Sequence, residues 1–411
     1  MKKQHASPAG HWSWGPGVGH SQAVRCGEVV WVSGQMATDA TGEKRGGSDP
    51  ISQLPGAMAN TERVLSEFGL GLDHVVKLLC FYVYDGTRDE AALLEALGAL
   101  LPRGLKPAVT AVPVPYLAFP GAEVLVEAFA MARPDGATMP RRHETPLALS
   151  PLPDAFAGVV RCGKMIFVSA QSPVTAQGEL LHPFDIVAQT GEVMACIKAA
   201  LAAFGAGFGD VVKINRWYVG QGRTEDFEPA ALACAASFEE PGPAATGVPI
   251  PRHAREGQLI KIEVVAMLGE DGSSLPRRQV WPDTLWDWTV NIPYWHGLKC
   301  HDMIFLGGQV SLDTRGIAVN PFDMRAQTAQ AMVHIGSILR ELGAGYDDIC
   351  KLTTVYAGPS GLAALRENQR IRDAFFAAPG PASTDVALPV LAYPGMIIEI
   401  DAFAMAEPDP A

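Results

Sequence analysis

The chain has 411 residues, of which 48% are apolar and only 18% are charged, a balance that suits roughly two to four packed domains and argues against extended disorder. A net charge of -12 without a basic block argues against nucleic acid or an anionic membrane as the partner. No segment approaches the roughly 18 uninterrupted apolar residues of a membrane helix, and residues 1–10 lack the apolar run of a signal peptide. We therefore expect a cytoplasmic protein. Seven cysteines at no metal-ligand spacing predict reduced thiols and no metal site.

The middle of the chain gives the first clear elements in chain order. Residues 133–151 are rich in proline, glycine and charge, which indicates a linker. An apolar strand is predicted over Met165–Ser169, and after a turn a helix is predicted to begin within residues 182–185. A second linker of similar composition is predicted over residues 270–282.

The last third adds the same kinds of element. A strand is predicted over Met303–Leu306, and Asn320 is the expected N-cap of a helix with Pro321 in its first position. Apolar residues at helical spacing follow, and Gly343 is expected to end that helix. A β-branched and aromatic strand over 349–356, a helix over 362–376 and a final strand region over 396–405 complete the pattern.

This pattern occurs three times. Gln35, Gln171 and Gln309 each end the same strand motif, so that consecutive copies lie 136 and then 138 residues apart. The same offsets relate further sets: Lys77, Lys213 and Lys351; Thr110, Thr246 and Thr384; Gly121, Gly257 and Gly395; Glu127, Glu263 and Asp401. Constant offsets over about 100 residues of each copy indicate three tandem domains, which we place at residues 11–134, 146–270 and 282–407.

Three motifs of each copy carry a family resemblance. They are the S-G-Q strand end, the G-x-G-x-x-D-[VI]-[VC]-K run at 205–213 and 343–351, and the P-A-x-T segment with its later I-E-[IV]-[ED]-A strand. The chain resembles the YjgF/RidA family, also called endoribonuclease L-PSP proteins or enamine/imine deaminases. The resemblance implies α/β (α+β) domains of chorismate-mutase-like fold, arranged as a trimer with a central β-barrel, outer helices and ligand clefts between neighbours. We therefore expect an intramolecular pseudo-trimer, self-contained as a monomer or a weak dimer, with three unequal clefts.

The resemblance also implies an arginine directly after P-A that grips a substrate carboxylate. That position holds Val109, Ala245 and Ser383 here, so no copy keeps the arginine. Its loss predicts a neutral or cationic substrate. Asp385, where the family carries cysteine, is either part of an acidic pair with Asp401 that divides acid and base roles or a turn residue.

The acids of the last strand are the first catalytic candidates. By resemblance, Glu127, Glu263 and Asp401 position or activate water, and a desolvated carboxylate suits a general base. Strand alternation places Asp401 on the same face as Glu399. The alternative is structural, because such a carboxylate also binds backbone amides or a neighbouring lysine.

The remaining candidates differ between the copies. The cleft tyrosine of the family corresponds to His20, Phe156 and Tyr294; His20 is either an acid/base group near neutral pH or a surface-loop histidine. Trp286 and Trp288 either wall a pocket or pack a linker onto the sheet. Arg252 is a replacement anion clamp or a solvated loop residue. Ser33, Ser169 and Thr384 complete the predicted substrate-binding set.

Taken together, the sequence predicts an enzyme that needs no cofactor or metal and acts on a small-molecule C–N bond. Hydrolytic deamination of an imine, enamine or amidine-like compound is the leading prediction, in the cleft expected to hold Asp385, Asp401 and Tyr294, with a His20/Glu127 cleft second. The alternatives are a non-catalytic metabolite-binding or regulatory protein, and a cyclase or dehydratase acting on a small amine or guanidino compound. Ribonuclease activity is disfavoured by the acidic charge.

Overall fold

Three units of one topology succeed one another in the computed structural model, which describes residues 1–15 and 17–409. The first unit is a six-stranded sheet in the order β1-β2-β3-β6-β4-β5 with two helices. Its elements are β1 (Lys3–Ala6), β2 (Ala23–Cys26), β3 (Val29–Gln35), α1 (Pro50–Ser66), β4 (Val75–Val83), α2 (Glu90–Gly98), β5 (Ala108–Val114) and β6 (Val124–Met131).

The second and third units repeat this order with equivalent strands. The second contains β7 (Arg141–Glu144), β8 (Val159–Cys162), β9 (Met165–Gln171), α3 (Ile186–Ala202), β10 (Val211–Val219), α4 (Thr224–Ala235), β11 (Ala244–Ile250) and β12 (Ile260–Met267). The third contains β13 (Arg277–Val280), β14 (Gly297–Cys300), β15 (Met303–Leu306), α5 (Met324–Glu341), β16 (Ile349–Ala357), α6 (Leu362–Asp373), β17 (Ala382–Leu388) and β18 (Ile398–Met405). The predicted threefold repeat of α/β units is therefore confirmed.

Strand pairing is mixed in every unit. The strands on either side of the second helix pair in parallel, as β10 does with β11, whereas the last strand lies antiparallel between two earlier ones, as β12 does between β9 and β10. A parallel pair needs a crossover connection, and α2, α4 and α6 supply it. The helices bury an apolar stripe on the sheet, as α5 does with Met332, Ile335 and Leu339.

Two expectations about element ends were wrong. The helix of the third unit begins after Asp323, whose side chain accepts hydrogen bonds from the backbone N–H groups of Arg325 and Ala326. Asn320 lies before that cap in the left-handed region, with φ of 52°. The helix predicted to reach residue 376 ends at Asp373.

The two segments predicted to be linkers also contain regular structure. β7 lies within residues 133–151 and β13 within residues 270–282, and each pairs antiparallel with the next strand of the chain. They form the outer strands of the second and third sheets, as β1 does in the first. The chain therefore begins each new sheet directly after leaving the previous one.

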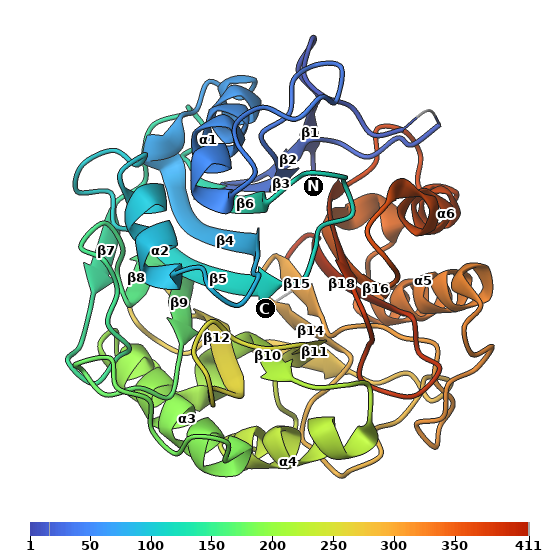
Figure 1. Cartoon of the computed structure of the whole chain (residues 1–411). Coiled ribbons are helices and arrows are strands. Elements are labelled where there is room, and N and C mark those ends of the chain that lie inside the picture. Colours follow the sequence, from blue (N-terminus) through green and yellow to red (C-terminus); the bar gives the residue numbers. More distant parts are fainter. Residues whose placement is uncertain (16, 410–411) are drawn as a thin grey trace.

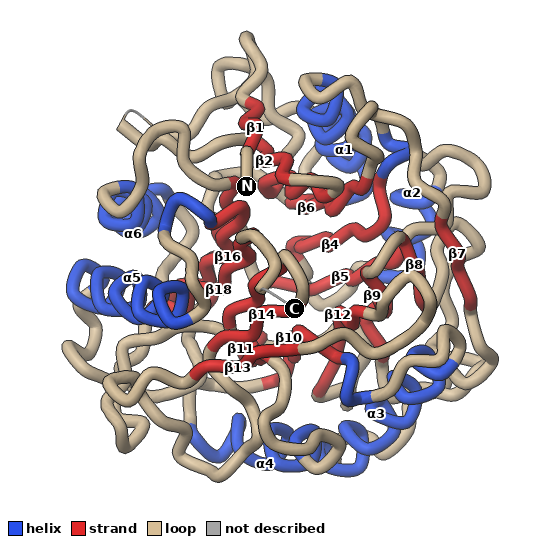
Figure 2. Tube along the Cα trace, turned by 180° about the vertical axis from the view of Figure 1, so that it is seen from behind, coloured by secondary structure: helices blue, strands red, loops and turns tan. Residues whose placement is uncertain are grey.

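The three sheets surround a common centre, and the six helices lie around the outside (Figure 1; Figure 2 from behind). Within the described residues the sheets stay separate ladders instead of one closed ladder, joined by isolated bridges such as Ala244 with Trp295 and Ser21 with Ala382. The ring closes between the first and third units, where the terminal ammonium of Met1 lies 3.7 Å from Glu407 Oε1. No helix in the part of the chain that the structure describes is long and apolar enough to cross a membrane.

Candidate functional site

Three buried ion pairs connect the units around the centre. Each joins a lysine of one unit to the last-strand acid of the next. The Nζ–carboxylate distances are 2.9 Å for Lys77 with Glu263, 2.5 Å for Lys213 with Asp401 and 2.8 Å for Lys351 with Glu127. Thr110 and Thr246 donate further hydrogen bonds to Glu263 and Asp401. The predicted catalytic acids thus take part in a cyclic network of ion pairs. This arrangement corresponds to the structural alternative, in which each carboxylate binds a neighbouring lysine.

These acids line a narrow central cavity of about 30 Å³. Glu399 lines it as well, because Glu399 and Asp401 face the same side of β18, opposite Val355 and Thr353 of β16. Glu399 also lines a cleft between units, so it stands at the boundary between the centre and that cleft.

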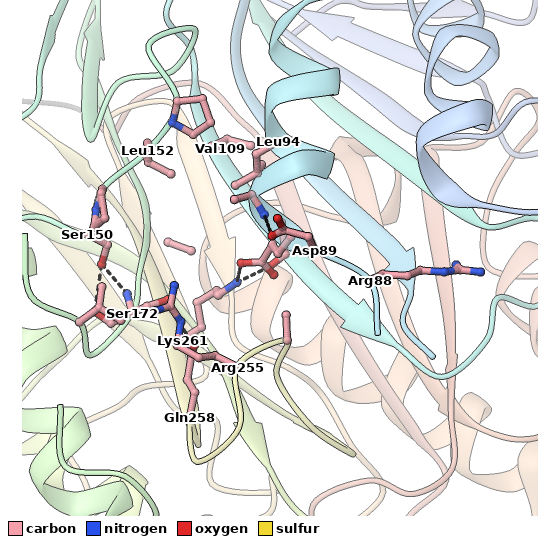
Figure 3. Close-up of a pocket in the computed structure, with 18 residues that line it drawn as sticks. Arg88, Asp89, Leu94, Val109, Ser150, Leu152, Ser172, Arg255, Gln258 and Lys261 are labelled. Carbon is pink, nitrogen blue, oxygen red and sulfur yellow. Dashed lines mark hydrogen bonds and ion pairs between the residues drawn. The ribbon is translucent and has the colours of Figure 1, made fainter. Parts of the chain in front are cut away.

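The three junctions between units differ in the side chains that meet there. We call them cleft 1–2, cleft 2–3 and cleft 3–1 after the units that meet there. Cleft 1–2 has a volume of about 330 Å³. In Figure 3 the apolar side chains of Leu94, Val109 and Leu152 lie at one end, and Lys261 lies among polar groups at the other.

A lysine occupies cleft 1–2 at the position that holds Glu399 in the third unit. Lys261 Nζ donates to Glu90 Oε1 at 2.7 Å and to the backbone oxygen of Ala111 at 2.8 Å. The other carboxylate oxygen of Glu90 accepts from Tyr82 Oη at 2.8 Å. The cleft therefore brings opposite charges from two units together.

A buried arginine that is not among the predicted site residues lies beside cleft 2–3. Arg216 is only 2% exposed, and its guanidinium carbon lies 5.2 Å from the ring centre of Phe227 and 5.3 Å from that of Tyr294. In the sheet it stands opposite Gly247 of β11, on the face that Ala245 shares two residues earlier. The guanidinium is thus one strand away from the position where the family arginine is missing.

Glu399 faces the same cleft from the third unit. Burial, and next the negative charge of Asp401, raise the pKa of Glu399 to about 8, although Lys213 and Arg216 oppose the rise. Two glycines make the space: a Cβ at Gly308 would lie 1.9 Å from Glu399 Oε1, and one at Gly247 would lie 3.1 Å from Arg216 Nη2. The other two clefts carry larger residues at one or both of the corresponding positions, Ala111 with Ala170 in cleft 1–2 and Asp385 with Gly34 in cleft 3–1.

Several buried polar atoms around cleft 2–3 have no hydrogen-bond partner among the described residues. They are Nε and Nη2 of Arg216, Oε2 of Glu399 and the hydroxyls of Tyr218 and Tyr294. Unpaired buried polar groups are costly, so this concentration indicates a place for water or a polar ligand. Trp288 stacks on Phe227 at 5.9 Å, and the free volume is only about 10 Å³, enough for about one water molecule.

Cleft 3–1 contains an ion pair that is internal to the third unit. Arg372 of α6 binds Asp385, and it also donates to Ser383 Oγ at 3.1 Å. His20 lies nearby and is 4% exposed, with both ring nitrogens unpaired within the described chain. Burial, with smaller contributions from the charges of Arg372 and Lys351, lowers the pKa of His20 well below its usual value. The imidazole is therefore neutral at pH 7 and buried, and it is not in a surface loop.

The three residues expected to share one cleft do not meet. Asp385 pairs with Arg372, Asp401 pairs with Lys213 at the centre, and Tyr294 lies over Arg216 in cleft 2–3. Asp385 and Asp401 also face opposite sides of their sheet, because they stand beside Thr354 and Thr353, which are consecutive residues of β16.

The predicted substrate-binding hydroxyls take part in contacts between units. Ser33 Oγ and Ser169 Oγ accept from the backbone N–H groups of Ser383 and Val109 of neighbouring units, at 3.1 Å and 2.8 Å. Thr384 Oγ1 accepts from Gly34 N at 2.9 Å and from Lys351. Their hydroxyls therefore hold neighbouring units together.

The remaining predicted residues lie in two places. Trp286 and Trp288 line cleft 2–3, and Trp286 Nε1 donates to Gln309 Oε1 at 3.3 Å. Arg252 is exposed and lies over the ring of Tyr84 in the first unit, at 5.7 Å. Among the described residues there is no group of three or more His, Cys, Asp or Glu side chains that could hold a metal ion.

A sequence signal for the missed residues does exist. Arg216 lies in a largely buried strand, and its counterparts at the repeat offsets are Cys80 and Thr354. Glu399 corresponds to Leu125 and Lys261. A charged residue at a buried strand position that changes between copies indicates a function of one cleft.

Comparison with known proteins gives the same threefold division. The Endoribonuclease L-PSP family model matches residues 14–132, 149–268 and 289–406. A RutC family protein of Pyrococcus abyssi is 29% identical over 116 residues, which are 28% of this chain and 87% of that protein. A RutC family protein of Pyrococcus horikoshii is 28% identical over 116 residues, which are 28% of this chain and 88% of that protein.

Single-unit structures are similar to one third of the chain. RidA from an Antarctic Psychrobacter is 26% identical with a TM-score of 0.27, covering 31% of this chain and 100% of its own. TdcF of E. coli, crystallised with bound serine, is 21% identical with a TM-score of 0.28, and the match covers 31% of this chain and 98% of TdcF.

Proposed function

Because the chain belongs to the Endoribonuclease L-PSP family in each of its three units, we propose that it is a cofactor-independent enzyme that hydrolyses the C–N bond of a small imine or enamine in cleft 2–3. The observation that carries this proposal is that Arg216 of the second unit and Glu399 of the third lie at the same junction, and that both side chains keep polar atoms unpaired within the described residues. Neither of the other clefts combines these two groups.

Arg216 supports a substrate that bears a carboxylate. A guanidinium presents parallel N–H donors that match the two oxygens of a carboxylate, and Nε and Nη2 of Arg216 are the atoms without partners. The expectation of a neutral or cationic substrate, which rested on the missing family arginine, is therefore replaced by a 2-imino acid or its enamine.

Glu399 supports acid–base chemistry near neutral pH, since a carboxyl with a pKa of about 8 is protonated before the reaction and is still able to ionise. It donates its proton to the imine nitrogen while a water oxygen bonds to the imine carbon, and its carboxylate accepts the proton that this water loses. In the resulting carbinolamine, a proton passes from oxygen to nitrogen through the same carboxyl. The C–N bond then breaks, leaving ammonia and a 2-oxo acid.

The small free volume limits the substrate. A space of about 10 Å³ holds about one water, so a substrate enters only when the aromatic side chains over the cleft move. Trp288 is only partly buried at the edge of the cleft, which makes it the side chain that we expect to swing outward. A substrate with a short side chain fits this arrangement best.

The proposal is tested by turnover of a 2-imino acid generated in the assay from a 2-amino acid by an amino-acid oxidase. Glu399→Gln keeps the shape of a protonated carboxyl and removes its proton transfer, so kcat is expected to fall about 100-fold or more. Arg216→Met is expected to lower kcat/KM by about tenfold or more. Thr354→Val, which changes the counterpart of Arg216 in the third unit, serves as the matched control and is expected to retain wild-type turnover.

A Glu399→Gln enzyme with more than half of the wild-type kcat would contradict the proposed chemistry. Binding of the 2-oxo acid product that depends on Arg216, without any turnover by the wild-type chain, would instead favour the non-catalytic metabolite-binding alternative.

A further inference from the structure

The junction between the third and first units joins the two ends of one linear chain. Residues 132–140 lead directly from β6 into β7, and residues 268–276 lead from β12 into β13, so the backbone connects the first unit to the second and the second to the third. The third and first units meet through noncovalent contacts, as Met1 and Glu407 do at 3.7 Å, and β2 and β16 lie side by side there. Closure of the ring therefore depends on this junction.

All three junctions share one contact between neighbouring sheets. A cation on the outermost strand of one sheet donates to the first backbone oxygen of the long strand in the neighbouring unit. The donors and acceptors are Lys3 and Ile349 at 2.9 Å, Arg141 and Val75 at 2.7 Å, and Arg277 and Val211 at 3.1 Å. Within their own sheets these cations stand opposite the repeated cysteines, which are Cys26, Cys162 and Cys300, respectively. The second residue of each long strand belongs to the same apolar cluster as these cysteines, so each junction brings it next to one of them.

The junction of the third and first units has a second cysteine at that place. The second residue of the long strand is Val76 in the first unit and Val212 in the second, but it is Cys350 in the third. Cys26 and Cys350 are 1% and 0% exposed, and a hydrogen bond connects their thiols. Two thiols thus face each other where the ends of the chain meet, whereas a cysteine faces a valine at the other two junctions.

The surroundings of Cys26 favour its thiolate. The hydrogen bond from Cys350 lowers the pKa of the Cys26 thiol, and the charges of the terminal ammonium and of Lys3 act in the same direction, although burial opposes them. Burial instead raises the pKa of Cys162 to about 11 and that of Cys300 to about 12. Because the thiolate is the form that reacts with oxidants, Cys26 is the most reactive of the three repeated cysteines.

We infer that Cys26 and Cys350 are a redox-active pair that forms a reversible disulfide and closes the ring covalently between its first and last units. The two residues are far apart in sequence, so in the unfolded chain the bond closes a loop that contains most of the molecule. A cross-link restricts the unfolded state more as this loop becomes longer. The inference is independent of the reaction in cleft 2–3.

A small hydroperoxide is the class of oxidant that suits this pair. The thiolate sulfur of Cys26 attacks one oxygen of hydrogen peroxide, the O–O bond breaks, and the leaving hydroxide takes up a proton to become water, so that Cys26 becomes a sulfenic acid. Sγ of Cys350 then attacks this sulfur, the S–O bond breaks, and the hydroxyl leaves as water with the proton of the Cys350 thiol. Two thiols are oxidised to one disulfide while one peroxide is reduced to two waters.

Oxidation of the full chain in its native state tests the pair. The reduced protein is treated with hydrogen peroxide, unfolded, alkylated and separated by electrophoresis without reductant. We expect a faster-migrating band, because a closed loop makes the unfolded chain more compact, and we expect dithiothreitol to reverse it. Peptide mass spectrometry is expected to find Cys26 linked to Cys350. If both thiols stay free to alkylate after the partly exposed Cys196 has been oxidised, or if the link involves another cysteine, the inference is wrong.

Variants and thermal unfolding give a second measurement. Cys350→Val introduces the residue that the other two units carry at this position, so it is expected to fold normally and to give no faster band. Cys196→Ser is the matched control and is expected to keep the band. Peroxide treatment is expected to raise the Tm of wild type and Cys196→Ser by about 3 °C or more and to leave that of Cys350→Val unchanged. A faster band or a similar rise in the Tm of Cys350→Val would overturn the inference.

Discussion

Glu399 and Asp401 stand two residues apart on β18 and face the same side of the sheet, yet their neighbours differ. Asp401 has Lys213 at 2.5 Å and a hydrogen bond from Thr246, and it belongs to the network that holds the units together. Oε2 of Glu399 and Oδ1 of Asp401 both lack a hydrogen-bond partner within the described residues, but Glu399 has no ion pair there and also lines cleft 2–3. One carboxylate therefore stabilises the assembly, and the other is available for chemistry.

The protonation of Glu399 predicts how stability depends on pH. Its pKa is 4.5 ordinarily and about 8 in the folded chain, so between these values the folded state binds a proton that the unfolded state has released. The contribution of Glu399 to the free energy of unfolding is therefore full below pH 4.5 and is lost as the pH rises towards 8. Glu399→Gln removes this dependence. Relative to wild type, its free energy of unfolding is expected to rise by more than about 1.4 kcal/mol between pH 5 and pH 8.

Urea unfolding of both proteins at the two pH values measures this difference. Thr354→Val, which removes no ionisable group, is expected to show the same pH dependence as wild type. A difference between Glu399→Gln and wild type that stays constant from pH 5 to pH 8 would mean that Glu399 titrates normally.

The sequence identified the residues that repeat in all three units more readily than the residues to which we assign the reaction. Lys77, Lys213 and Lys351 repeat because every junction needs the same ion pair, and their repetition made the acids of the last strand conspicuous. Arg216 and Glu399 occur once each, and their proximity depends on two units meeting in space. Strand alternation did place Glu399 beside Asp401 correctly, but it did not indicate which of them faces a cleft.

At the scale of elements, the helix starts show the limit of local motifs. Asn320-Pro321 has the residue types of a cap followed by a first helical position. The backbone instead turns through the left-handed region at Asn320 and Phe322, with φ of 52° and 64°, before Asp323 caps α5. The second unit does the same at His182 and Phe184, ahead of Asp185. The predicted motif included the aspartate that caps the helix, but the predicted N-cap, Asn320, lies three residues before the observed one, Asp323.

A pair of variants tests this cap. Asp323→Ala removes the acceptor of two backbone N–H groups and is expected to lower the free energy of unfolding by about 1 kcal/mol. Asn320→Gly preserves a left-handed backbone and is expected to leave stability nearly unchanged. Chemical denaturation followed by circular dichroism measures both. A larger loss for Asn320→Gly than for Asp323→Ala would restore Asn320 as the cap.

The outer strands β7 and β13 were missed because their composition is that of a loop. Both contain consecutive arginines, as in Arg141-Arg142 and Arg277-Arg278, and both pair on one side only, as the outermost strands of their sheets. Charged residues are favoured on edge strands because they discourage pairing with other chains. Strand formation here depends on the partner strand and not on local propensity.

At the scale of the molecule, the order of the units decides what each cleft contains. The faces that meet in one cleft come from different units, so a change in one unit alters one cleft alone. Lys261 pairs with Glu90 in cleft 1–2, Arg216 and Glu399 lie at cleft 2–3, and Arg372 binds Asp385 in cleft 3–1. A homotrimer repeats each substitution in all three clefts, whereas this chain does not.

The central claim is that only one of these unequal clefts takes the substrate carboxylate. A crystal structure of the chain soaked with a short 2-oxo acid, the product of the proposed reaction, tests it most directly. We predict the carboxylate within hydrogen-bond distance of Arg216 in cleft 2–3, with Trp288 displaced and the Arg372–Asp385 pair of cleft 3–1 intact. Product bound in cleft 3–1, or equally in all three clefts, would contradict the account.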